Sequence, residues 1–151
     1  MTPPRVSVVL PVRDAAATVE RAARSILDST LRELELIVID DGSADNSAAI
    51  VRQISDPRLR LVQQDALGVC AAANRGTAEA RAPVIARMDA DDFSHPARLE
   101  KQLSLLHDSG ADMVGCRVRI VDALGQPVES MQRYEQWSNS LTEPGRIAAM
   151  R

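Results

Sequence analysis

Apolar residues along the chain follow two alternating patterns. Short, nearly continuous runs rich in Val, Ile and Leu are typical of strands buried on both faces, as in a parallel sheet. We expect such strands at residues 5–12, 34–40, 59–63, 83–88 and 111–122. Apolar residues at helical spacing predict helices between them. We expect these helices at residues 16–27, 43–55, 68–81 and 96–110. Strands that alternate with helices indicate an α/β domain with a mainly parallel sheet.

Local signals set the expected boundaries. Asp14 or Thr18 is available to cap the first helix. Gly76 lies inside the third predicted helix and costs it about 1 kcal/mol. The stretch "ALGQP" at 123–127 predicts a hairpin turn after the fifth strand, and residues 133–151 follow no pattern that we can assign.

Composition narrows the classes of function. Apolar residues make up 45% of the chain and charged residues 26%, as in an ordinary soluble domain. The net charge of −3 and the scattered basic residues give no case for nucleic-acid binding. No apolar run reaches the roughly 20 residues that span a bilayer, and the first residues lack a signal-peptide core. We interpret Cys70 and Cys116 as small buried residues in a reducing compartment, which predicts a cytoplasmic location.

Acidic residues gather where predicted strands end. The first, second and fourth strands run into "PVRD" (11–14), "IDDGS" (39–43) and "MDADD" (88–92). Ligands of open parallel sheets bind outside the carboxyl ends of the strands. If these three strands are neighbours, the clusters converge on one crevice, which would be costly without a cation. Aspartates are also common in turns, but two clusters on one edge favour a site.

A divalent metal would offset this repulsion. Asp89 and Asp91 lie two residues apart in a loop. Mg²⁺ prefers one or two carboxylates together with waters and phosphate oxygens, and Mn²⁺ accepts the same ligands. The pattern therefore predicts a metal poised for a diphosphate. We expect Asp92 to cap the following helix or to position the loop, and His95 to be a solvent-exposed or capping residue rather than a ligand.

Three stretches resemble a known family. "VSVVLPVRDAAATVERAARSIL", "ELIVIDDGSADNSAAIV" and "LGVCAAANRGTAEARAPVIARMDADDFSHPARLEKQL" are similar to the start of an inverting, family 2 nucleotide-sugar glycosyltransferase. The resemblance covers about residues 5 to 128, with several motifs in order. It implies the Rossmann-like A-type glycosyltransferase fold, truncated here. Residues 1–132 would form the nucleotide-sugar-binding part, and residues 133–151 the incomplete start of the acceptor side.

The resemblance also implies roles for single residues. Asp41 matches the aspartate that hydrogen-bonds the nucleobase, and Asp40 lies beside it. Asp89 and Asp91 match the family's Asp-X-Asp pair, in which the second aspartate holds the metal on the diphosphate and the first lies near the ribose or the metal. The implied nucleotide-binding residues are Pro11, Val12, Arg13, Asp40, Asp41, Asp89 and Ala90, and the implied metal ligands are Asp89 and Asp91.

The same resemblance sets expectations for cofactor and partners. It implies Mg²⁺ or Mn²⁺, a nucleotide-diphosphate sugar as donor (a UDP-sugar in the first instance), a saccharide or lipid-linked acceptor, and a place in polysaccharide biosynthesis. We expect a cytoplasmic protein, with the inner face of the membrane as an alternative, although membrane association is not encoded in this chain. The nucleotide, sugar, acceptor and oligomeric state are not specified by the sequence.

Three departures from the family pattern stand out. Arg13 and Asp14 replace an aromatic residue and an asparagine, and Arg13 either reaches a phosphate or base or is a solvated side chain. Ala73 replaces an arginine, whose contact is then missing or moved to Arg75. The third departure is the general base, which lies well beyond the metal motif in the family. We expect this chain to lack that base, since the acidic residues that remain lack the family context: Glu129, Glu135 and Glu143.

Other functions were weighed against this one. A signalling receiver domain needs a lysine at the end of a late strand, but Lys101, the only lysine, lies in a predicted helix. A haloacid-dehalogenase-like phosphatase carries its Asp-X-Asp after the first strand, whereas here it follows the fourth. A non-catalytic module that binds a nucleotide-sugar stays open as the alternative, because donor binding and acceptor chemistry are separable.

Overall fold

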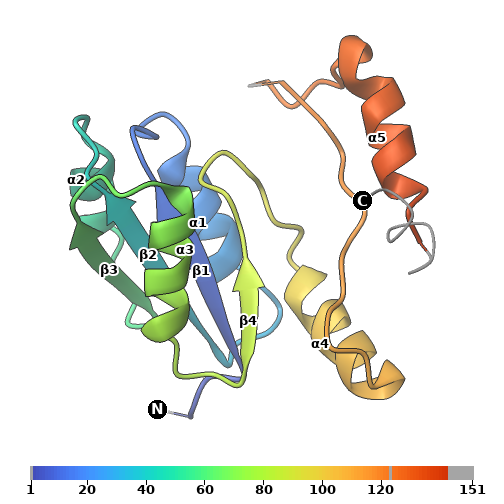
Figure 1. Ribbon diagram of the computed structural model, residues 1–151, viewed down its shortest axis with the longest axis horizontal. Coiled ribbons are helices and arrows are strands. Elements are labelled where there is room, and N and C mark those ends of the chain that lie inside the picture. Colours follow the sequence, from blue (N-terminus) through green and yellow to red (C-terminus); the bar gives the residue numbers. More distant parts are fainter. Residues whose placement is uncertain (1, 123, 143–151) are drawn as a thin grey trace. The chain divides into compact units, whose positions relative to one another are not determined.

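The computed structural model describes residues 2–122 and 124–142, and the chain divides after Ser104 into two compact units. The first unit is built on a four-stranded sheet in the order β3-β2-β1-β4, with every neighbouring pair parallel (Figure 1). Its strands are β1 (Val6–Val12), β2 (Leu34–Asp41), β3 (Leu59–Gln64) and β4 (Val84–Arg87). The expected α/β domain with a mainly parallel sheet is thus confirmed.

Helices follow each strand, close to the expected ranges. They are α1 (Val19–Leu27), α2 (Ser47–Arg52), α3 (Val69–Ala78) and α4 (Arg98–Ser109), the last of which crosses the boundary between the units. The largest difference is in α2, which is shorter than the predicted 43–55 because residues 43–46 form a loop that bonds to the segment after β1.

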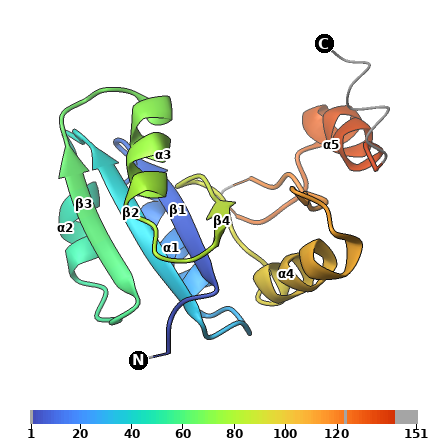
Figure 2. The same cartoon turned by 60° about the horizontal axis from the view of Figure 1, so that its bottom comes forward.

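Two hydrophobic layers hold this unit together. Helices α1 and α2 cover one face of the sheet, and α3 covers the other (Figures 1 and 2). Side chains of successive strand residues point to opposite faces. Leu36 and Val38 of β2 therefore pack in the α1 layer, while Ile37 and Ile39 pack with Ala72 of α3. Burial on both faces explains why the central strands are almost continuously apolar.

Gly76 allows close packing of α3 on the sheet, which its low helix propensity does not predict. Its position on α3 lies directly against β1, and a Cβ built there would overlap with the Cγ1 atom of Val9. Glycine therefore lets α3 approach the sheet closely, which outweighs the cost of glycine inside a helix.

The second unit corrects one prediction. Residues 111–122 do not form the expected fifth strand: among the described residues of this unit, pairing is limited to an isolated antiparallel bridge between Val121 and Pro127. The segment finds other partners on α5 (Gln132–Asn139), which follows a 3₁₀ turn at Glu129–Met131. The side chain of Asn139 accepts from Val118 N–H at 2.8 Å and donates to Val118 O at 2.7 Å.

The turn expected at 123–127 is present over its described residues. Asp122 N–H donates to Gln126 O at 2.8 Å, and Gly125 adopts a φ of +78°. Ala123 lies outside the described residues. The hairpin-like bridge thus closes a local turn and extends no sheet.

The cysteines and the lengths of the helices bear on two further sequence interpretations. Both cysteines are exposed, so the prediction that they are buried is wrong. On α3 the buried positions are Ala72 and Gly76, which turn Cys70 outward. The cysteines therefore no longer support a reducing compartment. Over the residues described, none of the helices combines the length and apolar character needed to cross a membrane.

Candidate functional site

The three acidic segments leave neighbouring strands. Strand β1 lies between β2 and β4, as the convergence of these segments required. Val12 pairs with Asp40 across β1 and β2, and Met88 N–H donates to Val9 O at 3.2 Å beside β4. The chain runs from β1 to β3 on one side and returns to β4 on the other, so the edge between β1 and β4 is a topological switch point. Ligands of open α/β sheets bind at such points.

Asp41 organises the loop that follows β3. Its carboxylate accepts from Gln64 Nε2 at 2.7 Å, from Leu67 N–H at 2.9 Å and from Gly68 N–H at 2.8 Å. The hydrogen bond from Gln64, assisted by these backbone N–H groups and by the nearby charge of Arg13, keeps the pKa of Asp41 below its usual value although burial opposes this. The side chain is therefore an ionised, buried acceptor with most of its lone pairs used.

Asp40 faces the opposite direction and closes its own turn. One oxygen accepts from Ser43 N–H at 3.2 Å, and the other from Gln63 Nε2 at 2.9 Å. Gln63 and Gln64 pair in register with Asp40 and Asp41. Sequence reasoning missed these two glutamines. The available signal was a polar Gln-Gln pair that ends an apolar strand at the same level as the Asp-Asp pair.

The segment after β1 is clasped to the segment after β2. Asp14 N–H donates to Ser43 Oγ at 3.1 Å, and Ala44 N–H donates to Asp14 Oδ1 at 2.7 Å. Asp14 has a φ of +50°, a left-handed conformation that Asp tolerates better than most residues. Of the two residues available to cap α1, Thr18 occupies the N-cap position but makes no side-chain cap bond, and Asp14 bonds to the other loop instead.

Asp45 makes further hydrogen bonds between the segments after β1 and β2. Its Oδ2 accepts from Ala16 N–H at 2.9 Å, and its Oδ1 accepts from Ser47 N–H at 2.9 Å at the start of α2. The hydroxyl of Ser47 and these two N–H groups lower the pKa of Asp45, with burial acting weakly against them. Ser47 Oγ in turn accepts from Ala15 N–H at 2.9 Å. Together these bonds fix the two loops beside the edge where β1 and β2 end.

The residues at the end of β1 and just after it differ in solvent exposure. Pro11 and Val12 are buried, so only Arg13 presents its side chain to solvent, with 54% of it exposed. The Arg13 guanidinium lies 4.0 Å from Asp41 Oδ2 and 4.0 Å from Asp14 Oδ2. It is therefore a cation held at the strand edge, with its outer face free for an anion or a planar base.

The loop after β4 exposes three carboxylates. Asp89, Asp91 and Asp92 are all exposed, while Ala90 between them is buried in the core. Asp92 N–H donates to Asp89 O at 3.2 Å and closes the turn. Partial desolvation, followed by the charges of Asp91 and Asp89, raises the pKa of Asp92. The like-charge repulsion expected from the sequence is thus present.

Neighbouring residues take roles that partly differ from those expected. Asp92 does not cap α4, which begins six residues later at Arg98. His95 acts as the capping residue instead, since its Nδ1 accepts from Ala97 N–H at 3.1 Å. Asp89 pairs with Arg87 at 3.1 Å, but both side chains are more than half exposed, so this pair adds little stability.

The carboxylates of the loop after β4 suit a cation whose remaining ligands come from water and a substrate. Within residues 2–122 and 124–142, no group of three or more His, Cys, Asp and Glu side chains is arranged to hold a metal ion. Asp89 and Asp91 nevertheless offer exposed oxygen atoms on one short turn. Two carboxylates completed by waters and phosphate oxygens fit Mg²⁺ or Mn²⁺, and a cation there would relieve the repulsion at Asp92.

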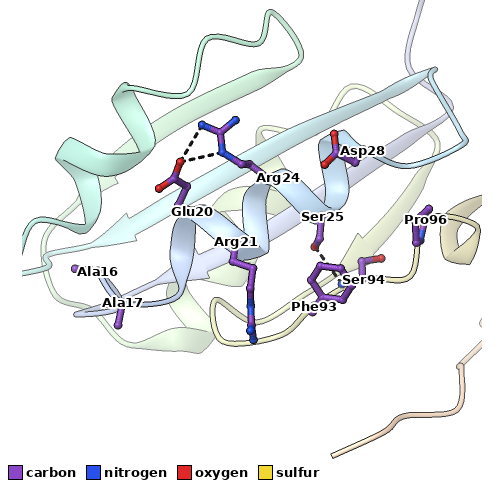
Figure 3. Close-up of a pocket in the computed structure, with 10 residues that line it drawn as sticks. All are labelled: Ala16, Ala17, Glu20, Arg21, Arg24, Ser25, Asp28, Phe93, Ser94 and Pro96. Carbon is purple, nitrogen blue, oxygen red and sulfur yellow. Dashed lines mark hydrogen bonds and ion pairs between the residues drawn. The ribbon is translucent and has the colours of Figure 1, made fainter. Parts of the chain in front are cut away.

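A hollow of about 470 Å³ lies along α1 (Figure 3). None of the predicted site residues lines it. Arg21 on α1 places its guanidinium 6.0 Å from the ring centroid of Phe93. Phe93 is the last residue of the loop after β4, residues 89–93, which we call the acidic loop. The hollow is lined by Ala16, Ala17, Glu20, Arg21, Arg24, Ser25, Asp28, Phe93, Ser94 and Pro96.

The other residues singled out from the sequence have local partners of their own. Arg75, the candidate replacement for the missing arginine, forms an exposed ion pair with Glu79 at 3.0 Å on α3. Glu135 Oε2 accepts from Ile120 N–H at 2.7 Å, and Glu129 lies in the short 3₁₀ turn. Glu143 lies outside the described residues.

Comparison with known proteins adds a second line of evidence. The family model described as "Glycosyl transferase family 2" matches residues 7–148. Among curated proteins, the chain is 36% identical over 124 residues to the succinoglycan biosynthesis protein ExoU of Rhizobium meliloti (strain 1021), covering 80% of this chain and 35% of that protein. The chain spans about a third of the length of the first curated relatives that it matches.

Solved structures share the fold. The mannosyltransferase PcManGT from Pyrobaculum calidifontis, in complex with GDP-Man and Mn²⁺, matches with a TM-score of 0.66 and 27% identity, covering 80% of this chain and 37% of that one. Residues 1–349 of S. aureus TarS, in complex with UDP-GlcNAc, match with a TM-score of 0.68 and 21% identity, covering 78% of this chain and 37% of that one. The second likeness concerns the fold alone.

Proposed function

This chain belongs to glycosyl transferase family 2, and from that premise we propose that it is the donor-binding part of an inverting, divalent-metal-assisted glycosyltransferase. The observation that carries the proposal is the placement of three polar segments at the ends of adjacent strands β2, β1 and β4. We assign residues 1–132 to nucleotide-sugar binding and residues 133–151 to the start of the acceptor side. The division of the chain after Ser104 is one of packing and does not test this assignment.

The nucleoside would be bound at the ends of β1 and β2. Asp41 would accept a hydrogen bond from the base with the lone pair that its three protein donors leave free. The backbone of Pro11 and Val12 would line the base and ribose, while the exposed guanidinium of Arg13 would contact the base or a phosphate. Asp40 would act indirectly, because both of its oxygens already hold the turn after β2.

The diphosphate would be bound at the acidic loop. Asp91 would hold the cation, with Asp89 near the ribose or the cation and Ala90 keeping the turn anchored in the core. When bound, Mg²⁺ or Mn²⁺ would take up charge that develops on the diphosphate as the sugar leaves. The protein's part is to present both carboxylates to solvent on one short turn.

Inverting transfer needs a general base that reaches the acceptor hydroxyl. We propose that this chain lacks it. Glu135 already accepts a backbone N–H from Ile120, and Glu129 lies in the 3₁₀ turn before α5, so neither carries the context of the family's general base. The acceptor would be a saccharide or a lipid-linked saccharide. A non-catalytic nucleotide-sugar-binding module remains the second candidate, because the same geometry serves binding alone.

The family relation also supports a role in polysaccharide biosynthesis, since ExoU is described as a succinoglycan biosynthesis protein. UDP-sugars and GDP-sugars are both candidate donors, because related structures carry UDP-GlcNAc and GDP-Man. We place the protein in the cytoplasm or at the inner face of the membrane as part of the proposal, because sugar nucleotides would be available there.

Calorimetric titration of the pure chain tests the proposal. UDP, GDP and ADP are titrated with Mn²⁺ and again with EDTA. We expect one of the first two nucleotides to bind more tightly than ADP, with a gain of about tenfold or more from Mn²⁺. Equal binding of all three nucleotides, or none, would contradict the donor site. Selective binding that ignores Mn²⁺ would leave the donor site in place and remove the metal from it.

A further inference from the structure

The acidic loop is anchored at both of its ends. Met88 before the loop and Ser94 after it are each 5% exposed, while the aspartates between them reach solvent. Ser94 N–H donates to Ser25 Oγ on α1 at 3.1 Å, and Ser25 Oγ donates to Ala22 O at 2.8 Å (Figure 3). A buried serine hydroxyl thus ties the end of the loop to α1.

The chain that follows the loop is tied to the same helix end. Pro96 O accepts from Thr30 N–H at 3.0 Å and from Ser29 Oγ at 3.1 Å. These bonds hold residues 94–96 against the segment after α1. The end of the acidic loop therefore cannot move away from α1 without breaking them.

One side chain joins the two ends of the loop directly. Arg98, the first residue of α4, donates from Nε to Ser94 Oγ at 2.9 Å and from Nη2 to Met88 Sδ at 3.8 Å. The guanidinium therefore spans the residue before the loop and the residue after it. Its charge also opposes the rise in the pKa of Asp92, although desolvation and the neighbouring aspartates dominate.

The geometry of the contact requires an arginine. A guanidinium presents several N–H donors in a planar fork, whereas a lysine ammonium is a single point on a flexible stem. Lysine at position 98 would keep the positive charge but would reach Ser94 or Met88, not both. Arg98 forms no hydrogen bond or ion pair with Asp89 or Asp91, all of which are described residues, so it would act on them through the shape of the loop.

We propose that Arg98 is a positioning residue that fixes the turn of the acidic loop so that Asp89 and Asp91 can share one divalent cation. This inference rests on the proposed function, because it assumes that the loop binds a metal–diphosphate group. Arg98 holds the ends of the loop, and the aspartates make the contact. Its loss should therefore weaken the metal-dependent part of nucleotide binding and spare the metal-free part.

The test compares Arg98→Gln and Arg98→Lys with wild-type protein, and uses Arg24→Gln as a matched control. Arg24 is an exposed arginine on α1 that pairs with Glu20 and, unlike Arg98, forms no hydrogen bond or ion pair with the described residues 88–98. UDP and GDP are titrated by calorimetry with Mn²⁺ and with EDTA. We expect Arg98→Gln to keep the EDTA affinity within about twofold and to lose about tenfold of the manganese-dependent gain, as when a residue supporting a metal ligand is removed. Arg98→Lys should fall in between, and Arg24→Gln should match wild type.

A second readout needs no ligand. Hydrogen–deuterium exchange of the metal-free protein follows the Ser94 amide, which Ser25 protects. We expect faster exchange over residues 88–95 in Arg98→Gln and unchanged exchange over β1. If Arg98→Gln does not fold, Arg98→Lys carries both measurements.

The outcomes separate the two proposals. An unchanged manganese-dependent gain in both Arg98 variants overturns the inference and leaves the proposed function intact. An equal loss with and without Mn²⁺ also overturns it, because Arg98 would then support the fold as a whole. Wild-type protein without any manganese-dependent gain refutes the metal role in the proposed function, and this inference with it.

Discussion

Ala44 N–H donates a 2.7 Å hydrogen bond to the carboxylate of Asp14, although the two residues belong to loops that follow different strands. The bond joins the segment after β1 to the segment after β2 beside the candidate site. It also holds Asp14 at a φ of +50°, which few residue types adopt without strain.

Asp14→Ala should lower the free energy of unfolding by about 1–2 kcal/mol, because it removes the acceptor for Ala44 N–H and leaves alanine in a left-handed conformation. Asp14→Asn should cost much less, since asparagine keeps a side-chain oxygen and tolerates this conformation. Urea denaturation of the two variants and wild type measures the difference. Equal losses in both variants would contradict the structural role given to Asp14.

Gly76→Ala should destabilise the protein by about 1–3 kcal/mol, because the added methyl group overlaps with Val9 and pushes α3 from the sheet. Helix propensity alone would predict a gain of about 1 kcal/mol. The sign of the change in urea denaturation therefore decides between packing and propensity. Gly115→Ala is the control, since no atom lies within 4 Å of a Cβ built there, and it should leave stability unchanged.

Stability should fall as the solution is acidified, in part through Asp45. Its pKa is lower in the folded protein than in the unfolded chain, where an aspartate titrates near 3.9. Such a group stabilises the fold above the unfolded value, and its contribution is lost as pH falls through the folded pKa. Urea denaturation at pH values from about 6 to about 2 should show a smaller loss in Asp45→Asn than in wild type. Parallel curves would contradict this origin of the pH dependence.

Donor turnover by this chain should be very slow. We expect little release of UDP from UDP-GlcNAc, or of GDP from GDP-Man, in a coupled phosphate assay, because the proposed donor part has no placed general base. A heat-denatured sample sets the background. Robust turnover by the pure chain would show that a base lies within its 151 residues.

The sequence predicted the central architecture well, for a physical reason. Strands β1 and β2 are buried on both faces, so their apolar runs are unambiguous, and the buried pair Asp40 and Asp41 marks where the apolar run of β2 ends. The segment 111–122 also contains several Val and Ile residues, but no strand lies beside it among the described residues of its unit, and side chains of α5 bind its backbone instead. Composition indicates that a segment can form a strand. It does not indicate whether a neighbouring strand is available to pair with that segment.

The site was predictable at the level of segments and less so at the level of contacts. The spacing of Asp89 and Asp91 and the family resemblance placed the acidic loop, and the sheet order brought it beside the other strand ends. The bonds from Arg98 to Ser94 and Met88 could not be predicted from spacing. They depend on how the segment between β4 and α4 folds back on itself. The close packing of Gly76 could not be predicted for the same reason: its neighbour Val9 is 67 residues away in sequence.

The most direct test of the central claim is the affinity for the bound nucleotide, measured with and without Mn²⁺ in wild type, Asp91→Asn and the control Asp112→Asn, an exposed aspartate of the second unit. If the ends of β1, β2 and β4 bind one metal–diphosphate group, Asp91→Asn should lose the manganese-dependent gain and keep the metal-free affinity, while Asp112→Asn matches wild type. A gain of the same size in Asp91→Asn and wild type would contradict the claim that this loop binds the cation.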